Sequence, residues 1–106
     1  MSTPSSHSMQ NMANEAAKLA DITQALLFGD IWQRPGLSPR ERSIATVAAL
    51  TALYRLEQLP FHLQLAMDNG ISRAELGELI THLAFYAGWP AAASAVDVLA
   101  TIPQGK

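Results

Sequence analysis

The sequence contains no cysteine among its 106 residues. Disulfides, thiolate metal sites and redox reactions at a thiol all require cysteine side chains, so these three features are excluded for this chain. Charged residues are also scarce, at 15% of the chain, whereas 49% of the residues are hydrophobic. A monomer with so few charges would leave apolar side chains in contact with solvent. We therefore expect other copies of the chain to cover part of its surface.

An excess of positive charge is absent too. The chain has seven lysines and arginines and nine acidic residues, which gives a formal net charge of -2 at pH 7. Proteins that bind nucleic acid need a basic face, so this balance argues against that class. The longest apolar run, residues 44–53, contains two threonines and is too short to span a bilayer. The first fifteen residues do not have the pattern of a secretory signal. We expect a soluble, cytoplasmic domain with no nucleic-acid or membrane partner.

Alternation of apolar and polar residues, the pattern of a strand, is missing as well, and the patterns that are present are helical. Residues 1–12 are rich in serine and predict a disordered tail. Residues 13–106 predict one all-α domain of about five helices. The helix expected after Ser38 is apolar on nearly all sides, which predicts that it is the central, buried one.

Helix ends are marked by local motifs. The sequences SPRE at residues 38–41 and SRAE at residues 72–75 have the form of a capping box, which predicts two helix starts. Asn69-Gly70 predicts the left-handed end of a helix that has Pro60 in its first turn. Gly88 predicts the end of the next helix, and Pro90 the start of the last one.

Two histidines are candidates for chemistry. His62 lies at the border of an apolar helix face, where spacing alone favours a histidine that is hydrogen-bonded to a carbonyl. Glu78 precedes His82 by four residues, so its carboxylate can orient the imidazole and raise its pKa. Glu75, Glu78, His82 and Tyr86 fall on one stripe of this helix, and an ordinary solvated polar face explains that stripe equally well. A metal site is disfavoured, because no pair of histidines has the spacing of a ligand motif.

Three arginines, Arg34, Arg40 and Arg42, lie near the start of the helix expected after Ser38. The N-terminus of a helix favours anions, so cations there are costly unless an acidic side chain or a substrate carboxylate binds them. An ordinary surface cluster is an equal alternative. Trp32 lies near a proline, where tryptophan is more often a packing residue than the wall of a pocket.

Three segments carry a family resemblance: RPGLSPRERS at residues 34–43, HLQLAMDNG at 62–70 and ITHLAFYAGWP at 80–90. They resemble the carboxymuconolactone decarboxylase family, and the likeness runs from about residue 27 to residue 96. The resemblance implies an all-helical subunit with an alkyl hydroperoxidase D-like fold. It also implies assembly into a homo-oligomeric ring, usually a trimer or a hexamer, with sites at or near subunit contacts.

The redox branch of this family carries a CxxCxxxH motif with a glutamate one helix earlier. When its histidine is aligned with His62, the two cysteine positions fall on Arg55 and Gln58, and the glutamate position falls at about Ser43. None of these residues is a thiol. Thiol peroxidase activity is therefore excluded.

The decarboxylase branch fits better. The resemblance implies a lyase without a cofactor that removes CO2 from 4-carboxymuconolactone in aromatic-compound catabolism, the β-ketoadipate pathway. This sequence offers candidates for both kinds of role. The catalytic candidates are His62, His82 and Glu78, and the substrate-binding candidates are Arg34, Arg42, Arg55, Glu57, Trp32 and Tyr86. The alternative is an oligomeric member that binds small carboxylates without turnover, or that acts as an isomerase or a lactone hydrolase.

Overall fold

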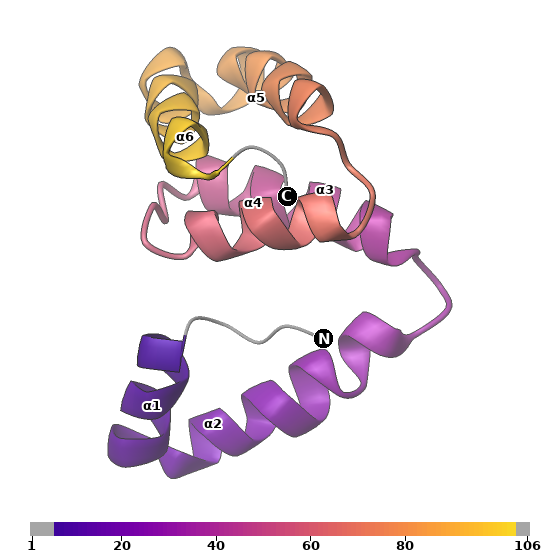
Figure 1. Ribbon diagram of the computed structural model, residues 1–106, viewed down its shortest axis with the longest axis vertical. Helices are drawn as coiled ribbons and strands as arrows, with labels where there is room; N and C mark the ends of the chain where they lie inside the picture. The colour runs from indigo at the N-terminus through magenta and orange to yellow at the C-terminus, as the bar shows by residue number, and fades with distance from the viewer. Residues whose placement is uncertain (1–5, 104–106) are drawn as a thin grey trace. The chain divides into compact units, whose positions relative to one another are not determined.

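The computed structural model describes the backbone of residues 6–103 and the side chains from Ser8 to Pro103. Within this range the chain is helical and has no strand, which confirms the all-α prediction (Figure 1). No helix of residues 6–103 is long and apolar enough to cross a membrane. The chain divides into two compact units, Met1–Pro39 and Arg40–Lys106, and each is described by itself.

The N-terminal unit is built from four short helical segments. They are α1 (Ser6–Glu15), α2 (Ala17–Ile22), a π-helix (Thr23–Phe28) and a 3-10 helix (Ile31–Gln33). The Thr23 hydroxyl donates to the Leu19 carbonyl oxygen at 2.8 Å. The rings of Phe28 and Trp32 stack with their centroids 6.0 Å apart, and both side chains are buried. These contacts give the unit a small apolar centre.

Helix α1 begins inside the segment that the serine content predicted to be a disordered tail. The difference concerns residues 6–12, because residues 1–5 lie outside the described part of the chain. Met12 supplies a physical reason. Its side chain is half-buried, and the Thr23 hydroxyl lies 3.7 Å from its sulfur. Contacts of this kind with a later helix order a segment whose composition alone favours disorder.

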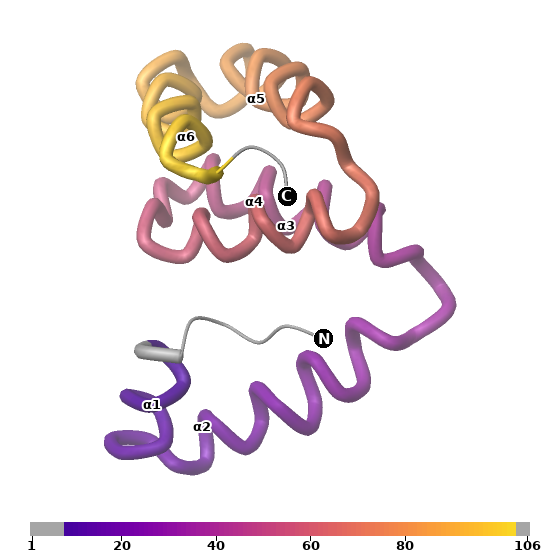
Figure 2. The backbone as a smooth tube through the Cα atoms, viewed as in Figure 1, coloured from indigo at the N-terminus to yellow at the C-terminus, as the bar shows by residue number. Residues whose placement is uncertain are grey.

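The C-terminal unit holds four longer helices, whose path Figure 2 follows. They are α3 (Pro39–Ala52), α4 (Leu59–Asp68), α5 (Arg73–Ala87) and α6 (Trp89–Thr101). Helix α6 packs against both α5 and α4. The best-buried apolar side chains come from all four helices, and those with at most 1% exposure are Val47, Leu59, Leu63, Ala66, Leu76, Ile80 and Ala95. With six α-helices in the described residues, the predicted number of about five is close.

The prediction that α3 is the central, buried helix holds only for part of its surface. The helix buries one stripe, made of Ser43, Val47 and Thr51 at spacings of four residues, and each of these side chains is fully buried. Ala45 and Ala49 are exposed. The number of apolar residues in a helix indicates how many of its side chains can be buried. It does not indicate which sides of the helix other helices cover.

Helix α5 starts and ends as its motifs predicted. The backbone N–H of Glu75 donates to the Ser72 hydroxyl at 3.0 Å, and the Ser72 N–H donates to the Glu75 carboxylate at 2.9 Å. This is a complete capping box. Gly88 ends the helix with a φ of 102°, and Gly70 has a φ of 96° after α4. Both angles lie in the region that glycine adopts without steric cost.

Replacing Ser72 by alanine is expected to lower the free energy of unfolding by about 1 kcal/mol, because the Glu75 N–H loses its acceptor. Urea unfolding followed by circular dichroism measures this change. Thr81→Ala on the same helix is the matched control, since its hydroxyl only donates back to the Gly77 carbonyl. Equal losses in the two variants would contradict the prediction.

Two further ties join segments that are distant in the sequence. Arg73, at the start of α5, donates to the carbonyl oxygens of Leu99 and Ile102 at the end of α6. A cation there also complements the negative end of the helix dipole. Tyr54, just after α3, has a φ of 62°, and its hydroxyl lies 3.1 Å from the Ser94 hydroxyl on α6. Both ties connect α6 to other parts of the C-terminal unit.

Candidate functional site

His62 lies on α4 next to residues that are fully buried. Its own side chain is half-buried, and its ring meets that of Phe61 edge-on, with centroids 4.9 Å apart. Burial lowers the pKa of His62 below its ordinary value of 6.5, since desolvation disfavours the charged imidazolium. Near neutral pH the ring is therefore mainly uncharged. An uncharged imidazole offers one ring nitrogen as a hydrogen-bond donor and the other as an acceptor.

The titration of His62 tests this environment directly. We expect its ring resonances in NMR spectra to titrate with a midpoint below 6.5. The unfolded chain binds this proton more readily than the folded chain, so the contribution of His62 to stability is complete above about pH 6.5 and falls as the pH drops below it. His62→Gln, which cannot titrate, should lose less stability than wild type over the same acid range. A midpoint at or above 6.5 would contradict the prediction.

His82 lies on α5 and is exposed, in contrast to His62. Its ring packs beside that of Tyr86, with centroids 4.9 Å apart and planes tilted by 34°. Among the described side chains, no hydrogen bond or ion pair joins His82 to Glu78, which is also exposed. The orienting role of Glu78 therefore stays a prediction. The structure does bring His82 and Tyr86 together, so an imidazole and a phenol share one exposed face.

The arginines near the start of α3 differ in their surroundings. Arg40 is exposed and forms an ion pair with Glu75 at 2.7 Å. The Ser72 backbone N–H, followed by Arg40, holds the pKa of Glu75 below its ordinary value of 4.5. Arg40 is thus bound by an acidic side chain, which is one of the two kinds of partner expected for these arginines. Arg42 is half-buried in the first turn of α3.

The remaining predicted residues lie in two places. Arg55 and Glu57 are exposed in the connection between α3 and α4. Trp32 and Arg34 belong to the N-terminal unit and are described with it alone. Trp32 is buried against Phe28, which is the packing role that the sequence favoured for it.

A pair that the sequence did not single out joins two of the helices that carry candidate residues. The Asn69 side-chain amide, at the end of α4, donates to the Ser43 hydroxyl on α3 at 3.0 Å. Ser43 is fully buried. The only signal in the sequence was the alignment that placed Ser43 at the glutamate position of the redox branch, and it pointed to no partner.

Three aromatic side chains stand exposed where α5 meets α6, and we call them the aromatic patch: Phe85 at 74% exposure, Tyr86 at 78% and Trp89 at 68%. Beside the patch, α5 and α6 enclose a groove of about 210 Å³. The groove is lined by Ile80, Thr81, Ala84, Trp89, Ala92, Ala93 and Val96. This lining has no charged group, so it suits an apolar contact better than an anionic substrate.

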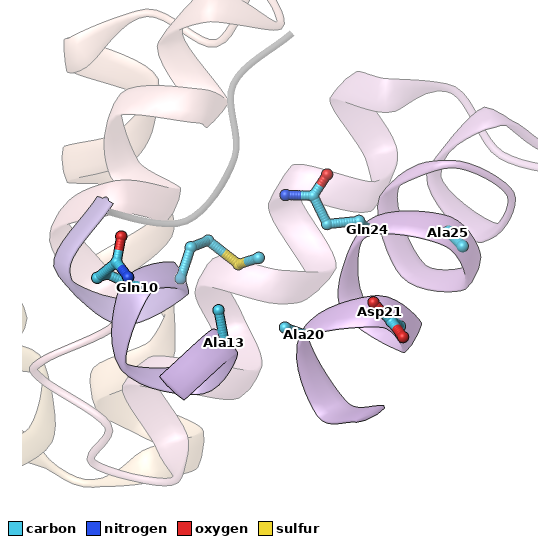
Figure 3. A pocket seen from close by; sticks show the side chains of 7 residues that line it. Gln10, Ala13, Ala20, Asp21, Gln24 and Ala25 are labelled. Atoms are coloured by element: carbon cyan, nitrogen blue, oxygen red, sulfur yellow. The ribbon is translucent and has the colours of Figure 1, made fainter. Parts of the chain in front are cut away.

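A larger hollow of about 660 Å³ lies within the N-terminal unit (Figure 3). Gln10 and Ala13 line it from α1, Ala20 and Asp21 line it from α2, and the π-helix adds Gln24 and Ala25. Its single charged lining group is a carboxylate, which repels a substrate that carries carboxylates. Neither this hollow nor the groove beside the aromatic patch includes His62, His82 or Arg42.

Comparison with known proteins identifies the family of the chain. The model of the carboxymuconolactone decarboxylase family matches residues 17–101. The chain is 36% identical over 91 residues to a 4-carboxymuconolactone decarboxylase from Acinetobacter baylyi (strain ATCC 33305 / BD413 / ADP1), covering 86% of this chain and 68% of that protein. It is 34% identical over 71 residues to a nitrosuccinic acid decarboxylase from Metarhizium robertsii (strain ARSEF 23 / ATCC MYA-3075), covering 67% of this chain and half of that protein. The family match spans most of the chain and agrees with its helical fold, and the chain belongs to the carboxymuconolactone decarboxylase family.

Proposed function

We propose that this protein is a carboxy-lyase that needs no cofactor and acts on a small carboxylated lactone, 4-carboxymuconolactone or a close relative of it. The observation that carries the proposal is the 36% identity to a 4-carboxymuconolactone decarboxylase over 86% of the chain. Both relatives are named as decarboxylases, which supports the predicted reaction class.

The chemistry of this substrate explains why no cofactor is required. The carboxylate that leaves as CO2 sits on a carbon that is conjugated through C=C to the lactone carbonyl. When the C–C bond breaks, its electron pair moves into the lactone and forms a dienolate oxygen. A proton then adds to carbon. The protein has to bind the substrate's carboxylates, stabilise the dienolate and supply that proton.

His62 is best suited to stabilise the dienolate. Its lowered pKa keeps the imidazole uncharged at neutral pH, and an uncharged imidazole still carries one N–H that can donate a hydrogen bond to the dienolate oxygen. His82 is exposed, so it can exchange protons with water and deliver one to carbon. Half-buried Arg42 is the strongest candidate to anchor a carboxylate, with Arg34 and Arg55 as further candidates.

The name of the second relative indicates how far the substrate class extends. Nitrosuccinic acid is a small dicarboxylic acid, and a nitro group accepts an electron pair on its oxygens much as an unsaturated lactone does. What the two named substrates share is a carboxylate together with a group that can take up electrons. We infer that this chain requires the same combination, and that a plain dicarboxylate binds without reacting.

The proposal includes a homo-oligomeric ring as the active form, a trimer or a hexamer. Exposed apolar side chains on both units support this assembly, among them Leu19 and Leu26 in the N-terminal unit and the aromatic patch in the C-terminal unit. Light scattering at micromolar concentration should give the mass of at least three chains. A monomer would overturn this part of the proposal. The cytoplasmic location and the single-domain organisation remain predictions.

The activity test is direct. Purified protein is added to 4-carboxymuconolactone while ultraviolet absorbance and CO2 release are followed together. One CO2 for each lactone consumed supports the decarboxylase. Lactone loss without CO2 would indicate an isomerase or a hydrolase instead. If the lactone raises the melting temperature but is not consumed, the chain is a binding protein that lacks the chemistry.

A further inference from the structure

The hydrogen bond between Ser43 and Asn69 joins two helices that carry candidate residues, α3 and α4. Ser43 is fully buried on α3, and its hydroxyl accepts from the Asn69 amide across 26 residues of sequence. Asn69 is itself fixed, because its backbone N–H donates to the carbonyl oxygens of Leu65 and Ala66 at the end of α4. Displacing either partner would leave the fully buried Ser43 hydroxyl without this hydrogen bond, which disfavours alternative arrangements.

Ser43 adjoins one candidate residue in the sequence, and Asn69 ends the helix that carries another. Ser43 directly follows Arg42 in the first turns of α3. Asn69 follows His62 by seven residues, about two helical turns, so the two residues lie on the same side of α4. The bond therefore joins the turn that carries the carboxylate anchor to the helix that carries the hydrogen-bond donor.

Another residue of the same stripe shows that α3 tolerates a buried hydroxyl without such a bond. Thr51 is as fully buried as Ser43, and its hydroxyl has no hydrogen-bond partner among the described residues. Burial in this stripe thus does not by itself require a partner from α4. Of these two buried hydroxyls, the one that is hydrogen-bonded to Asn69 is Ser43, which lies at the end of α3 that carries Arg42.

We propose that the Ser43–Asn69 hydrogen bond is a positioning device that sets Arg42 on α3 relative to His62 on α4, so that both groups reach one substrate. The inference rests on the proposed decarboxylase function. Ser43 and Asn69 do not touch the substrate. They act through the placement of two groups that do, and a small displacement of such groups is costly, because about 1 Å of misplacement can reduce a rate about 100-fold.

The kinetic test compares Ser43→Ala, Asn69→Ala and the double variant with wild type, at a temperature where circular dichroism shows all of them folded. We expect each single variant to lose about 10- to 100-fold in kcat/KM. Most of the loss should fall on kcat, because Arg42 still binds the substrate carboxylate. The double variant should lose no more than either single one, since all three remove the same bond. Thr51→Val, which removes a buried hydroxyl but no hydrogen bond, should keep wild-type kinetics.

A second readout does not depend on turnover. The ring resonances of His62 in NMR spectra should shift in Ser43→Ala and stay at their wild-type positions in Thr51→Val. If wild type does not consume the lactone, the proposed function fails, while these resonances still decide whether the bond positions His62. Unchanged kcat in a folded Ser43→Ala variant would overturn the proposal. So would additive losses in the double variant, or an unshifted His62 ring.

Discussion

Replacing His62 by alanine is expected to reduce turnover of the carboxylated lactone by about 10²- to 10³-fold, the usual range for loss of one positioned hydrogen-bond donor. The half-buried ring is uncharged at neutral pH, because burial lowers its pKa. It can therefore face a dienolate as a neutral donor. Steady-state kinetics on the purified variant measures the loss, and it should appear mainly in kcat, since the dienolate forms only as CO2 leaves.

Two variants give the matched comparison. His62→Gln keeps an N–H of similar reach, so it should retain more activity than His62→Ala if the ring acts as a hydrogen-bond donor. A glutamine cannot deliver a proton to carbon, so equal losses would instead assign acid catalysis to His62. His82→Ala tests the exposed histidine of α5. Full activity of His62→Ala together with loss in His82→Ala would reverse the two roles.

Replacing Leu76 by alanine is expected to lower the free energy of unfolding by about 2–5 kcal/mol. Leu76 is fully buried in the core where α5 meets its neighbours, and the smaller side chain leaves a cavity that a small domain cannot easily close. The stability of a domain of this size is about 5–15 kcal/mol in total, so one such change removes a large share of it. Urea unfolding of wild type and variant measures the difference.

Phe85→Ala on the same helix is the control for Leu76→Ala. Its ring is 74% exposed, so the isolated subunit should lose little stability when it is removed. If the aromatic patch lies in a subunit contact, Phe85→Ala should lower the oligomer mass rather than the stability of the subunit. Similar unfolding losses in both variants would contradict the assignment of Leu76 to the core and Phe85 to the surface.

Local chemistry made the helix ends predictable. The capping box at Ser72 needs only residues three positions apart, and the turn at Gly88 needs only a residue that tolerates positive φ. Helix α1 was not predicted, because its order depends on contacts such as that of Met12 with Thr23, eleven residues later. Burial of α3 was overestimated, because its exposed alanines fit a core or a surface equally well.

The candidate site was predicted only in part, for a similar reason. Sequence placed His62 at the border of an apolar face, and the structure adds how far its ring is buried, which sets the direction of its pKa. The spacing of Glu78 and His82 fits an interaction, but such spacing only makes contact possible. The pairing of Ser43 with Asn69 depends on how α3 and α4 pack, and no local pattern reports that.

Tyr54 has a practical consequence for protein engineering. Left-handed backbone at a residue other than glycine invites replacement by glycine in a redesign for heat resistance, because glycine relieves the steric cost there. Here the same exchange would delete the phenol whose hydroxyl lies 3.1 Å from that of Ser94, and with it one contact between the end of α3 and α6. Directed evolution towards a thermostable catalyst should therefore retain the tyrosine at this corner and find its improvements elsewhere in the chain.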